Sequence, residues 1–257
     1  MKYHPTTDAL QQLKNMLFLS SLSYDIIYTQ IYMPKTSEKE IFSNITNYVQ
    51  FVPCGILKII ALRSKDSKTL YVAIANTREE LHVEYNQVFP RFEKLEKIKF
   101  NSKYFEHFLE VKEEIKIIIE DFVRNGGTEV WLTGHSSGGS IASITAYYIE
   151  KILNIKDIKV VTFGAPPFTN YYGSKWYENK ITYTRVDINK DPIPDMESTD
   201  GYERYFHIYS TYLLIKNKCF YLKKTYTSSG CSCINLLPIL YNHKIGTYKN
   251  KLNNILN

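Results

Sequence analysis

No apolar run in this sequence approaches the roughly 18 residues that a membrane-spanning helix needs. The apolar residues 16–19 are too few, and lie too far into the chain, to form the core of a signal peptide. We therefore expect a soluble protein with no transmembrane segment. The compartment stays open, with an intracellular location favoured over export.

Cysteine is also scarce, with four residues in a chain of 257. Cys231 and Cys233 form a C-x-C pair, but no second pair or nearby histidine accompanies it, so the sequence gives no reason to expect zinc. A bridge from Cys219 to either of them and a set of free thiols are equally compatible with this spacing. Four cysteines in a chain of this length are not a disulfide framework. The fold must therefore depend on its core, for which 44% hydrophobic residues are sufficient.

The chain has no nucleic-acid-binding module and no basic stripe interleaved with aromatic residues. Its 32 basic and 26 acidic residues give a net charge of +6, which is a mild excess. A solvated, lysine-rich face accounts for such an excess, and peripheral contact with an anionic lipid surface would also use it. We therefore expect no nucleic-acid partner.

The pattern of apolar residues predicts a helix over residues 8–31 and a clearer helix over 104–124. In the second helix the apolar residues recur every three or four positions, at Phe108, Val111, Ile115, Ile118, Ile119 and Phe122. Six further segments read as strands, namely a hairpin over 56–63 and 69–75, a buried strand at 158–163, a strand at 181–186, and an antiparallel pair over 204–215 and 218–225.

From the long helix onward, predicted strands and helices alternate along the chain. Such alternation is typical of an α/β fold with a mostly parallel central sheet and helices on both of its faces. No repeat or low-complexity linker interrupts the sequence. We therefore treat residues 1–257 as a single domain.

Residues 134–138 read Gly-His-Ser-Ser-Gly, which is a G-x-S-x-G pentapeptide. A β-prone segment precedes it and a buried helix follows, and this is the setting in which a nucleophile elbow exposes a serine hydroxyl. The two glycines lack the Cβ atoms that would clash in so sharp a turn. Ser136 is therefore the predicted nucleophile, because Ser137 has no glycine two residues before it. The alternative is a Gly/Ser-rich turn without chemistry.

A serine nucleophile needs a base, which is usually a histidine that a carboxylate orients. In α/β-hydrolases the chain order is serine, acid, histidine. Of the two histidines after Ser136, His207 lies in a predicted strand and suits a structural role, whereas His243 lies in a loop near the C-terminus and suits a base. The acid candidates Asp187, Asp191 and Asp195 follow the strand that ends at residue 186. Asp191 precedes Pro192, which indicates a turn, and spacing alone favours it only slightly.

His135 directly precedes the predicted nucleophile. Its side chain should project away from Ser136, and we therefore expect it to contribute packing or a hydrogen bond behind the reacting atoms.

Several motifs, in order, resemble those of the class 3 lipases, the α/β-hydrolase family that includes the secreted fungal triacylglycerol lipases. Residues 132–139 look like the family's T-G-H-S-L-G-G elbow, and residues 161–166 are similar to its T-F-G-x-P segment. Residues 185–194 resemble its R-V-x-N-x-x-D-x-V-P segment, which implies that Asp191 is the triad acid. His243 falls where the family has its catalytic histidine. The resemblance spans residues 8–250 and implies an α/β-hydrolase fold.

Residues 71–77 align with the family's oxyanion strand, V-V-A-F-R-G-T, but Ile74, Ala75 and Asn76 replace its Phe-Arg-Gly. The resemblance implies that Thr77 supplies one oxyanion-hole N–H and Ser137 the other. A displaced Thr77 would leave a slow enzyme with a complete triad, because one oxyanion donor is worth about 10²–10³ in rate. Residues 78–100 follow, where the family carries its lid; an ordinary surface helix and loop is the alternative.

The resemblance implies a serine hydrolase that cleaves carboxylic esters of lipids through Ser136, Asp191, His243 and an acyl-enzyme. No metal or organic cofactor is needed for this chemistry. A phospholipase A1, a galactolipase or a small-ester esterase would use the same residues. A lipase-like scaffold that binds without turnover, and a protease, are the alternatives from other classes.

Overall fold

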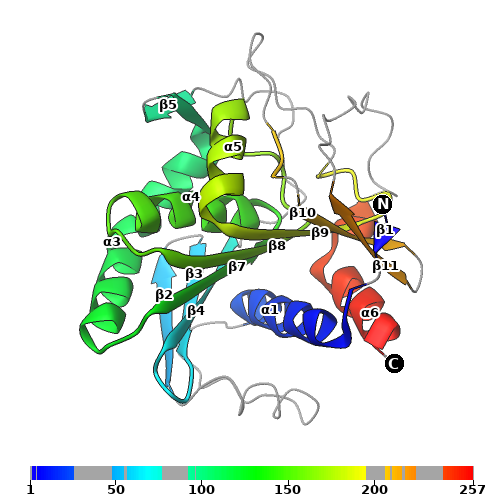
Figure 1. Ribbon diagram of the computed structural model, residues 1–257, viewed down its shortest axis with the longest axis horizontal. Helices are drawn as coiled ribbons and strands as arrows, with labels where there is room; N and C mark the ends of the chain where they lie inside the picture. Colours follow the sequence, from blue (N-terminus) through cyan, green and yellow to red (C-terminus); the bar gives the residue numbers. More distant parts are fainter. Residues whose placement is uncertain are drawn as a thin grey trace.

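The structure is a computed structural model that describes residues 2–3, 5–25, 48–54, 57–76, 92–95, 97–194, 206–208, 210–215, 218–223 and 240–256. Among these residues, nine strands form one central sheet in the order β1-β11-β10-β9-β8-β7-β4-β3-β2 (Figure 1). Their bounds are β1 Lys2–Tyr3, β2 Tyr48–Cys54, β3 Leu57–Arg63, β4 Thr69–Asn76, β7 Glu129–His135, β8 Asp157–Phe163, β9 Thr182–Ile188, β10 Ser210–Ile215 and β11 Lys218–Lys223.

The middle of the sheet is parallel and its two edges are antiparallel. Strands β4, β7, β8, β9 and β10 run in the same direction, whereas β2 and β3 on one side and β11 and β1 on the other pair in antiparallel fashion. This mostly parallel sheet confirms the predicted fold class. Because the carboxyl ends of parallel strands meet at one edge, residues far apart in sequence can share a site there.

Helices cover both faces of the sheet (Figure 1). Helices α3 (Ser102–Arg124), α4 (Ser137–Lys151) and α5 (Tyr171–Lys180) pack on one face, while α1 (Thr7–Asp25) and α6 (Ile245–Leu256) pack together on the other. Successive residues of a strand point to opposite faces. Leu132 of β7 accordingly joins the first core and Trp131 the second, which explains why the central strands read as continuous apolar runs.

Several predicted elements match closely, and others need correction. All six apolar residues predicted on the 104–124 helix are buried in α3. The predicted 8–31 helix is described only as far as Asp25. The late strand is described from Ser210, and the described residues 206–208 before it form no strand, since Phe206 makes only an isolated bridge to Thr169. Helices α5 and α6 were not predicted from the sequence.

The segment predicted as a lid, residues 78–100, is described only at its C-terminal end. There β5 (Phe92–Leu95) and β6 (Ile98–Asn101) form a small antiparallel sheet. Ile98 and Phe100 are buried in the core beneath α3 and α4, so this end is fixed to the body of the protein. Residues 78–91 and 96 lie outside the described residues, and a lid there stays a prediction.

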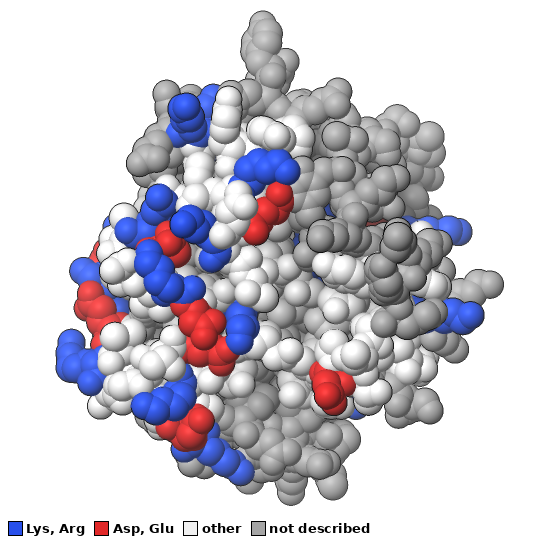
Figure 2. Space-filling model, viewed as in Figure 1, with Lys and Arg blue, Asp and Glu red and all other residues white. Residues whose placement is uncertain are grey.

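Charged side chains of both signs are interspersed along α3, at the left of the space-filling view (Figure 2). Lys112 pairs with Glu113 at 3.7 Å, and Arg63 from β3 pairs with Asp121. On this face, therefore, α3 presents a mixed solvated surface and not a patch of one sign.

None of the helices in the described part of the chain is long and apolar enough to cross a membrane. Cys219 carries a free thiol in the core beside α1 and α6, and burial raises its pKa to about 12. Such a thiol stays protonated and unreactive at neutral pH. Its two predicted alternative partners, Cys231 and Cys233, lie outside the described residues.

Candidate active site

The G-x-S-x-G pentapeptide forms a sharp turn between β7 and α4. Ser136 has φ 55° and ψ −135°, a backbone conformation that costs free energy for any residue with a Cβ atom. Two main-chain hydrogen bonds hold it there: Ser136 N–H donates to the Phe163 carbonyl at 3.0 Å, and Gly139 N–H donates to the Ser136 carbonyl at 2.9 Å. The turn therefore has the strained geometry of a nucleophile elbow.

The two glycines of the pentapeptide are required by close approach of main-chain atoms. A Cβ atom on Gly134 would lie 2.4 Å from the carbonyl carbon and oxygen of Gly138. A Cβ atom on Gly138 would lie 2.4 Å from the Ile74 carbonyl oxygen of β4. Side chains at either position would push α4 away from the strands and move Ser136.

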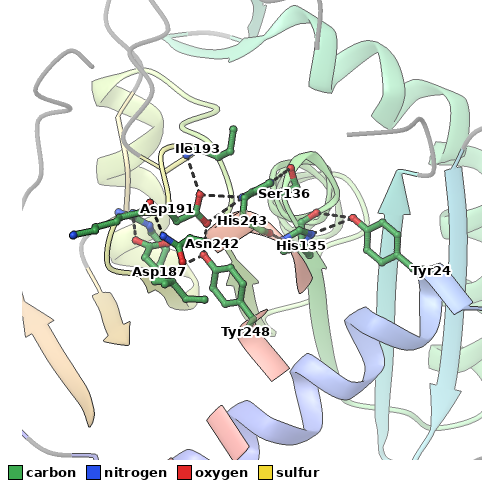
Figure 3. A network of polar contacts seen from close by, with 12 residues as sticks. Tyr24, His135, Ser136, Asp187, Asp191, Ile193, Asn242, His243 and Tyr248 are labelled. Atoms are coloured by element: carbon green, nitrogen blue, oxygen red, sulfur yellow. Dashed lines mark hydrogen bonds and ion pairs between the residues drawn. The ribbon is translucent and has the colours of Figure 1, made fainter. Parts of the chain in front are cut away.

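The side chains of Ser136, His243 and Asp191 form one chain of hydrogen bonds (Figure 3). His243 Nε2 lies 2.8 Å from Ser136 Oγ, and His243 Nδ1 lies 3.1 and 3.0 Å from the two carboxylate oxygens of Asp191. A carboxylate can only accept, so Nδ1 carries the proton and Nε2 is free to accept the serine proton. The imidazole and the carboxylate are both buried.

Asp191 reaches His243 from a turn after β9. Its N–H donates to the Ile188 carbonyl at 2.9 Å, and Lys190 within the turn has φ 69°. The Asp191 carboxylate also accepts from Ile193 N–H at 3.0 Å. Of the other acid candidates, Asp187 pairs with Arg185 on the same strand, and residue 195 lies outside the described residues.

Tyr248 contacts Asp191, and this role could not be predicted from the sequence. Its hydroxyl donates to Asp191 Oδ2 at 2.5 Å and accepts from Ile188 N–H at 3.3 Å. Burial, and then the charges of Asp191 and Asp187, raise the pKa of Tyr248 well above its usual value, so the hydroxyl stays protonated and donates. No sequence pattern singled out Tyr248, because it lies on the buried side of α6, a helix that was not predicted.

Gly164, in the segment that resembles T-F-G-x-P, makes room for this contact. It has φ 56°, and a Cβ atom there would lie 2.7 Å from the Tyr248 hydroxyl oxygen and 2.8 Å from Asp191 Oδ2. Glycine is therefore needed at this position both for the backbone conformation and for the space.

His207 has structural surroundings. Its Nε2 donates to the Pro194 carbonyl, and its own carbonyl accepts from Ser174 Oγ at 3.0 Å. Burial, and then the nearby Arg185 guanidinium, hold the pKa of His207 well below its usual value. A neutral, buried histidine that ties two loops together agrees with the structural role expected for it.

In the sequence, the predicted oxyanion donors directly follow Ser136 and Asn76, the last residue of β4. Ser137 is the first residue of α4, where backbone N–H groups have no partner within the helix. Thr77 lies outside the described residues, but β4 ends beside the elbow, with Ile74 opposite Gly134 in the sheet. Both donors stay predictions. Among the described residues, no group of three His, Cys, Asp or Glu side chains is arranged to hold a metal ion.

Comparison with known proteins gives matches of three kinds. A family model described as Lipase (class 3) matches residues 60–200. A lipase of Caenorhabditis elegans is 37% identical over 71 residues, which cover 26% of this chain and 20% of that protein. The chain thus matches about a fifth of the length of that relative.

Solved structures of fungal lipases have the same fold. Lipase II of Rhizopus niveus superposes with a TM-score of 0.77 at 16% identity, over 95% of this chain and 96% of that one. A lipase of Rhizopus microsporus gives 0.75 at 17% identity, over 95% and 87%. A triacylglycerol lipase whose catalytic centre is a serine protease triad gives 0.71 at 16% identity, over 95% and 94%.

At these identities the structural likeness establishes the α/β-hydrolase fold, and the family follows from the sequence match. That match covers more than half of the chain and includes the elbow and the turn that carries Asp191. The chain therefore belongs to the class 3 lipase family of carboxylic ester hydrolases.

Proposed function

We propose that the protein hydrolyses carboxylic esters of lipids, with Ser136 as nucleophile, His243 as general base and Asp191 as the group that orients the imidazole. The observation that carries this proposal is the 2.8 Å approach of His243 Nε2 to Ser136 Oγ while Nδ1 is bonded to Asp191. A serine hydroxyl is a weak nucleophile until such a base takes its proton. The buried carboxylate keeps the imidazole in the tautomer that can do so.

The reaction proceeds in two acyl-transfer steps. The Ser136 hydroxyl attacks the ester carbonyl while its proton passes to His243 Nε2, and a tetrahedral oxyanion forms. When the carbon–oxygen bond to the alcohol breaks, His243 gives the proton to the departing alcohol, which leaves an acyl group on Ser136. Water then attacks this acyl-enzyme, again losing a proton to His243, and the carboxylic acid leaves as Ser136 recovers its proton.

In this mechanism the main-chain N–H groups of Ser137 and Thr77 stabilise the oxyanion. The start of α4 supports the first assignment, because its orphan N–H groups favour negative charge. The assignment of Thr77 depends on the altered sequence at the end of β4, which reads Ile74, Ala75 and Asn76. A poorly aligned donor there lowers the rate without disturbing the triad.

The proposed substrate class is a water-insoluble ester such as a triacylglycerol, met at a lipid surface that the protein contacts peripherally. Family membership and the triacylglycerol lipases among its structural neighbours support this choice. Phospholipids and small esters would react at the same three side chains, so a substrate panel distinguishes them.

A fluorophosphonate probe and an ester panel test the proposal together. We expect the probe to modify Ser136, and we expect release of acid from short-chain nitrophenyl esters and from a triglyceride emulsion. Phospholipid vesicles in the same panel report phospholipase activity. A folded protein that remains unlabelled and cleaves none of these esters would be a binding scaffold, and the proposal would be wrong.

Tyr248→Phe is expected to lower kcat by about 10-fold, because a hydrogen bond to a charged group is worth roughly 1.5–3 kcal/mol and this one holds the carboxylate behind His243. Phenylalanine keeps the ring that packs between Phe163 and His135. KM for a soluble ester should change little, since Tyr248 is fully buried. Steady-state kinetics on such an ester, with the folded fraction checked by thermal unfolding, measure the effect.

Tyr177→Phe is the matched control for this variant. Tyr177 is equally buried, and its hydroxyl donates to the Ser143 carbonyl at 2.6 Å, inside α4. Tyr177→Phe should lose about 1 kcal/mol of folding free energy, and Tyr248→Phe should lose about 1.5–3 kcal/mol because its partner is a carboxylate. Only Tyr248→Phe should lose kcat, and equal kcat losses in the two variants would contradict a specific role for Tyr248.

A further inference from the structure

We propose that His135, the residue before the nucleophile, is a positioning residue that holds the main chain of the catalytic base. This inference rests on the proposed function. The contact that carries it is a 2.6 Å hydrogen bond between His135 Nε2 and the carbonyl oxygen of His243 (Figure 3). It joins residues 108 positions apart, and neither His135 nor His243 offers an appreciable surface to solvent.

The partners of the His135 ring fix its proton. A carbonyl oxygen can only accept, so Nε2 must carry the hydrogen and donate it. A neutral imidazole then has Nδ1 as an acceptor, and the Tyr24 hydroxyl lies 3.4 Å from it. The same hydroxyl lies 3.3 Å from the His135 carbonyl oxygen. The hydroxyl of Tyr24, from the last turn of α1, donates to the His135 carbonyl, so the tautomer of the ring is set by the His243 carbonyl, which requires a hydrogen on Nε2.

Aromatic rings enclose the His135 side chain. The His243 ring lies with its centroid 4.7 Å away and its plane tilted by 30°. Tyr24 and Tyr248 meet His135 at steep angles, with centroids 6.0 and 5.7 Å away. The ring therefore has little freedom to turn away from the His243 carbonyl, and the hydrogen bond is held by packing as well as by its own strength.

This arrangement lets one strand end control both reacting side chains. Ser136 carries the nucleophilic hydroxyl, and His135 beside it anchors the backbone of the residue that takes the serine proton. During turnover the His243 imidazole must serve first the serine oxygen and then the oxygen of the departing alcohol. A fixed main chain with a free side chain suits this task, because the ring can shift slightly while its origin stays in register with the elbow.

His135→Phe tests the proposal, because phenylalanine retains the ring volume and removes the donor. We expect kcat on a soluble nitrophenyl ester to fall about 10–100-fold, as a misplaced catalytic group costs, while KM stays within about twofold. His135→Gln carries an amide N–H that can reach the same carbonyl, and it should recover most of kcat. All rates are divided by the concentration of sites that react with a fluorophosphonate, which removes the effect of misfolded protein.

His107→Phe is the control for loss of a buried histidine. His107 lies in α3, bonds to Glu110 at 3.1 Å, and takes no part in the site. It should lose folding stability without losing kcat per reactive site. The same behaviour in His135→Phe, or a His135→Gln variant as slow as His135→Phe, would overturn the positioning role and leave the proposed function standing. A wild-type protein that neither labels nor cleaves esters would instead refute the proposed function, and the positioning role with it.

Discussion

Ser136→Ala is expected to abolish ester hydrolysis, with kcat falling on the order of 10⁶-fold, as in other serine triads from which the nucleophile is removed. The reason is chemical, because alanine has no oxygen to attack the ester carbonyl or to carry the acyl group. The fold should survive. Alanine fits the turn as serine does, and the two main-chain hydrogen bonds that hold residue 136 do not involve its side chain.

The measurement combines kinetics with mass spectrometry of the fluorophosphonate-treated protein. Wild-type protein should carry the label on the peptide that contains Ser136, and the variant should carry none. Ser140→Ala serves as the control, because Ser140 is a buried serine of α4, the helix that follows Ser136, and its hydroxyl donates to the Pro166 carbonyl at 3.0 Å. It should lose stability and keep its label. A label on Ser137 in the variant would reassign the nucleophile.

His243→Ala should produce a loss of similar size, on the order of 10⁶-fold in kcat, because without a base the hydroxyl of Ser136 stays protonated. The contrast is His207→Ala, in which a buried ring and its hydrogen bond to the Pro194 carbonyl are removed. We expect that variant to fold poorly and to lose stability, with the remaining folded molecules active. Circular dichroism, thermal unfolding and kcat per reactive site separate the two effects.

The opposite result would overturn the assignment of the base. A His207→Ala protein that is folded and inactive, beside a His243→Ala protein that still cleaves esters, would exclude His243. The surroundings of His207 argue against this outcome, because its lowered pKa makes the ring a weak base and its Nε2 donates to the Pro194 carbonyl. His243 Nε2, by contrast, lies 2.8 Å from Ser136 Oγ.

Much of the fold could be predicted from local patterns. The six apolar residues of α3 follow a helical period, and the central strands read as continuous apolar runs because both of their faces are covered. The elbow was predictable for a physical reason, since the glycines at 134 and 138 are imposed by contacts within a few residues and with the neighbouring strand. Such local constraints require glycine at fixed positions, and this requirement can be recognised in the sequence.

Other parts depend on contacts that no local pattern contains. Spacing could not choose among Asp187, Asp191 and Asp195, because the choice depends on which carboxylate faces a histidine 52 positions away. The turn indicated by Pro192 favoured Asp191 slightly, and the family resemblance selected it. Asp187 instead pairs with Arg185, two residues earlier on the same strand.

Tyr248 was missed for the same reason. A single tyrosine on the buried side of a helix reads as packing, and its hydroxyl meets a carboxylate 57 positions earlier. The strand predicted around His207 was wrong for the described residues 206–208, because Ile208 is buried in the core and Phe206 contacts Tyr171 of α5 and makes only an isolated bridge to Thr169. In both cases tertiary contacts decided the outcome, and the sequence pattern carried no trace of them.

The packing of α1 against α6 has a consequence for the order in which the chain folds. These helices lie near opposite ends of the chain and meet directly, as in the bond from Lys249 to Ser21, 228 positions apart. We expect this contact to form late in folding, because the entropy of closing so long a loop must be lost before the contact can stabilise the chain. A partly folded chain could thus hold a finished sheet and elbow yet remain inert, and the onset of hydrolysis would mark the docking of its two terminal helices.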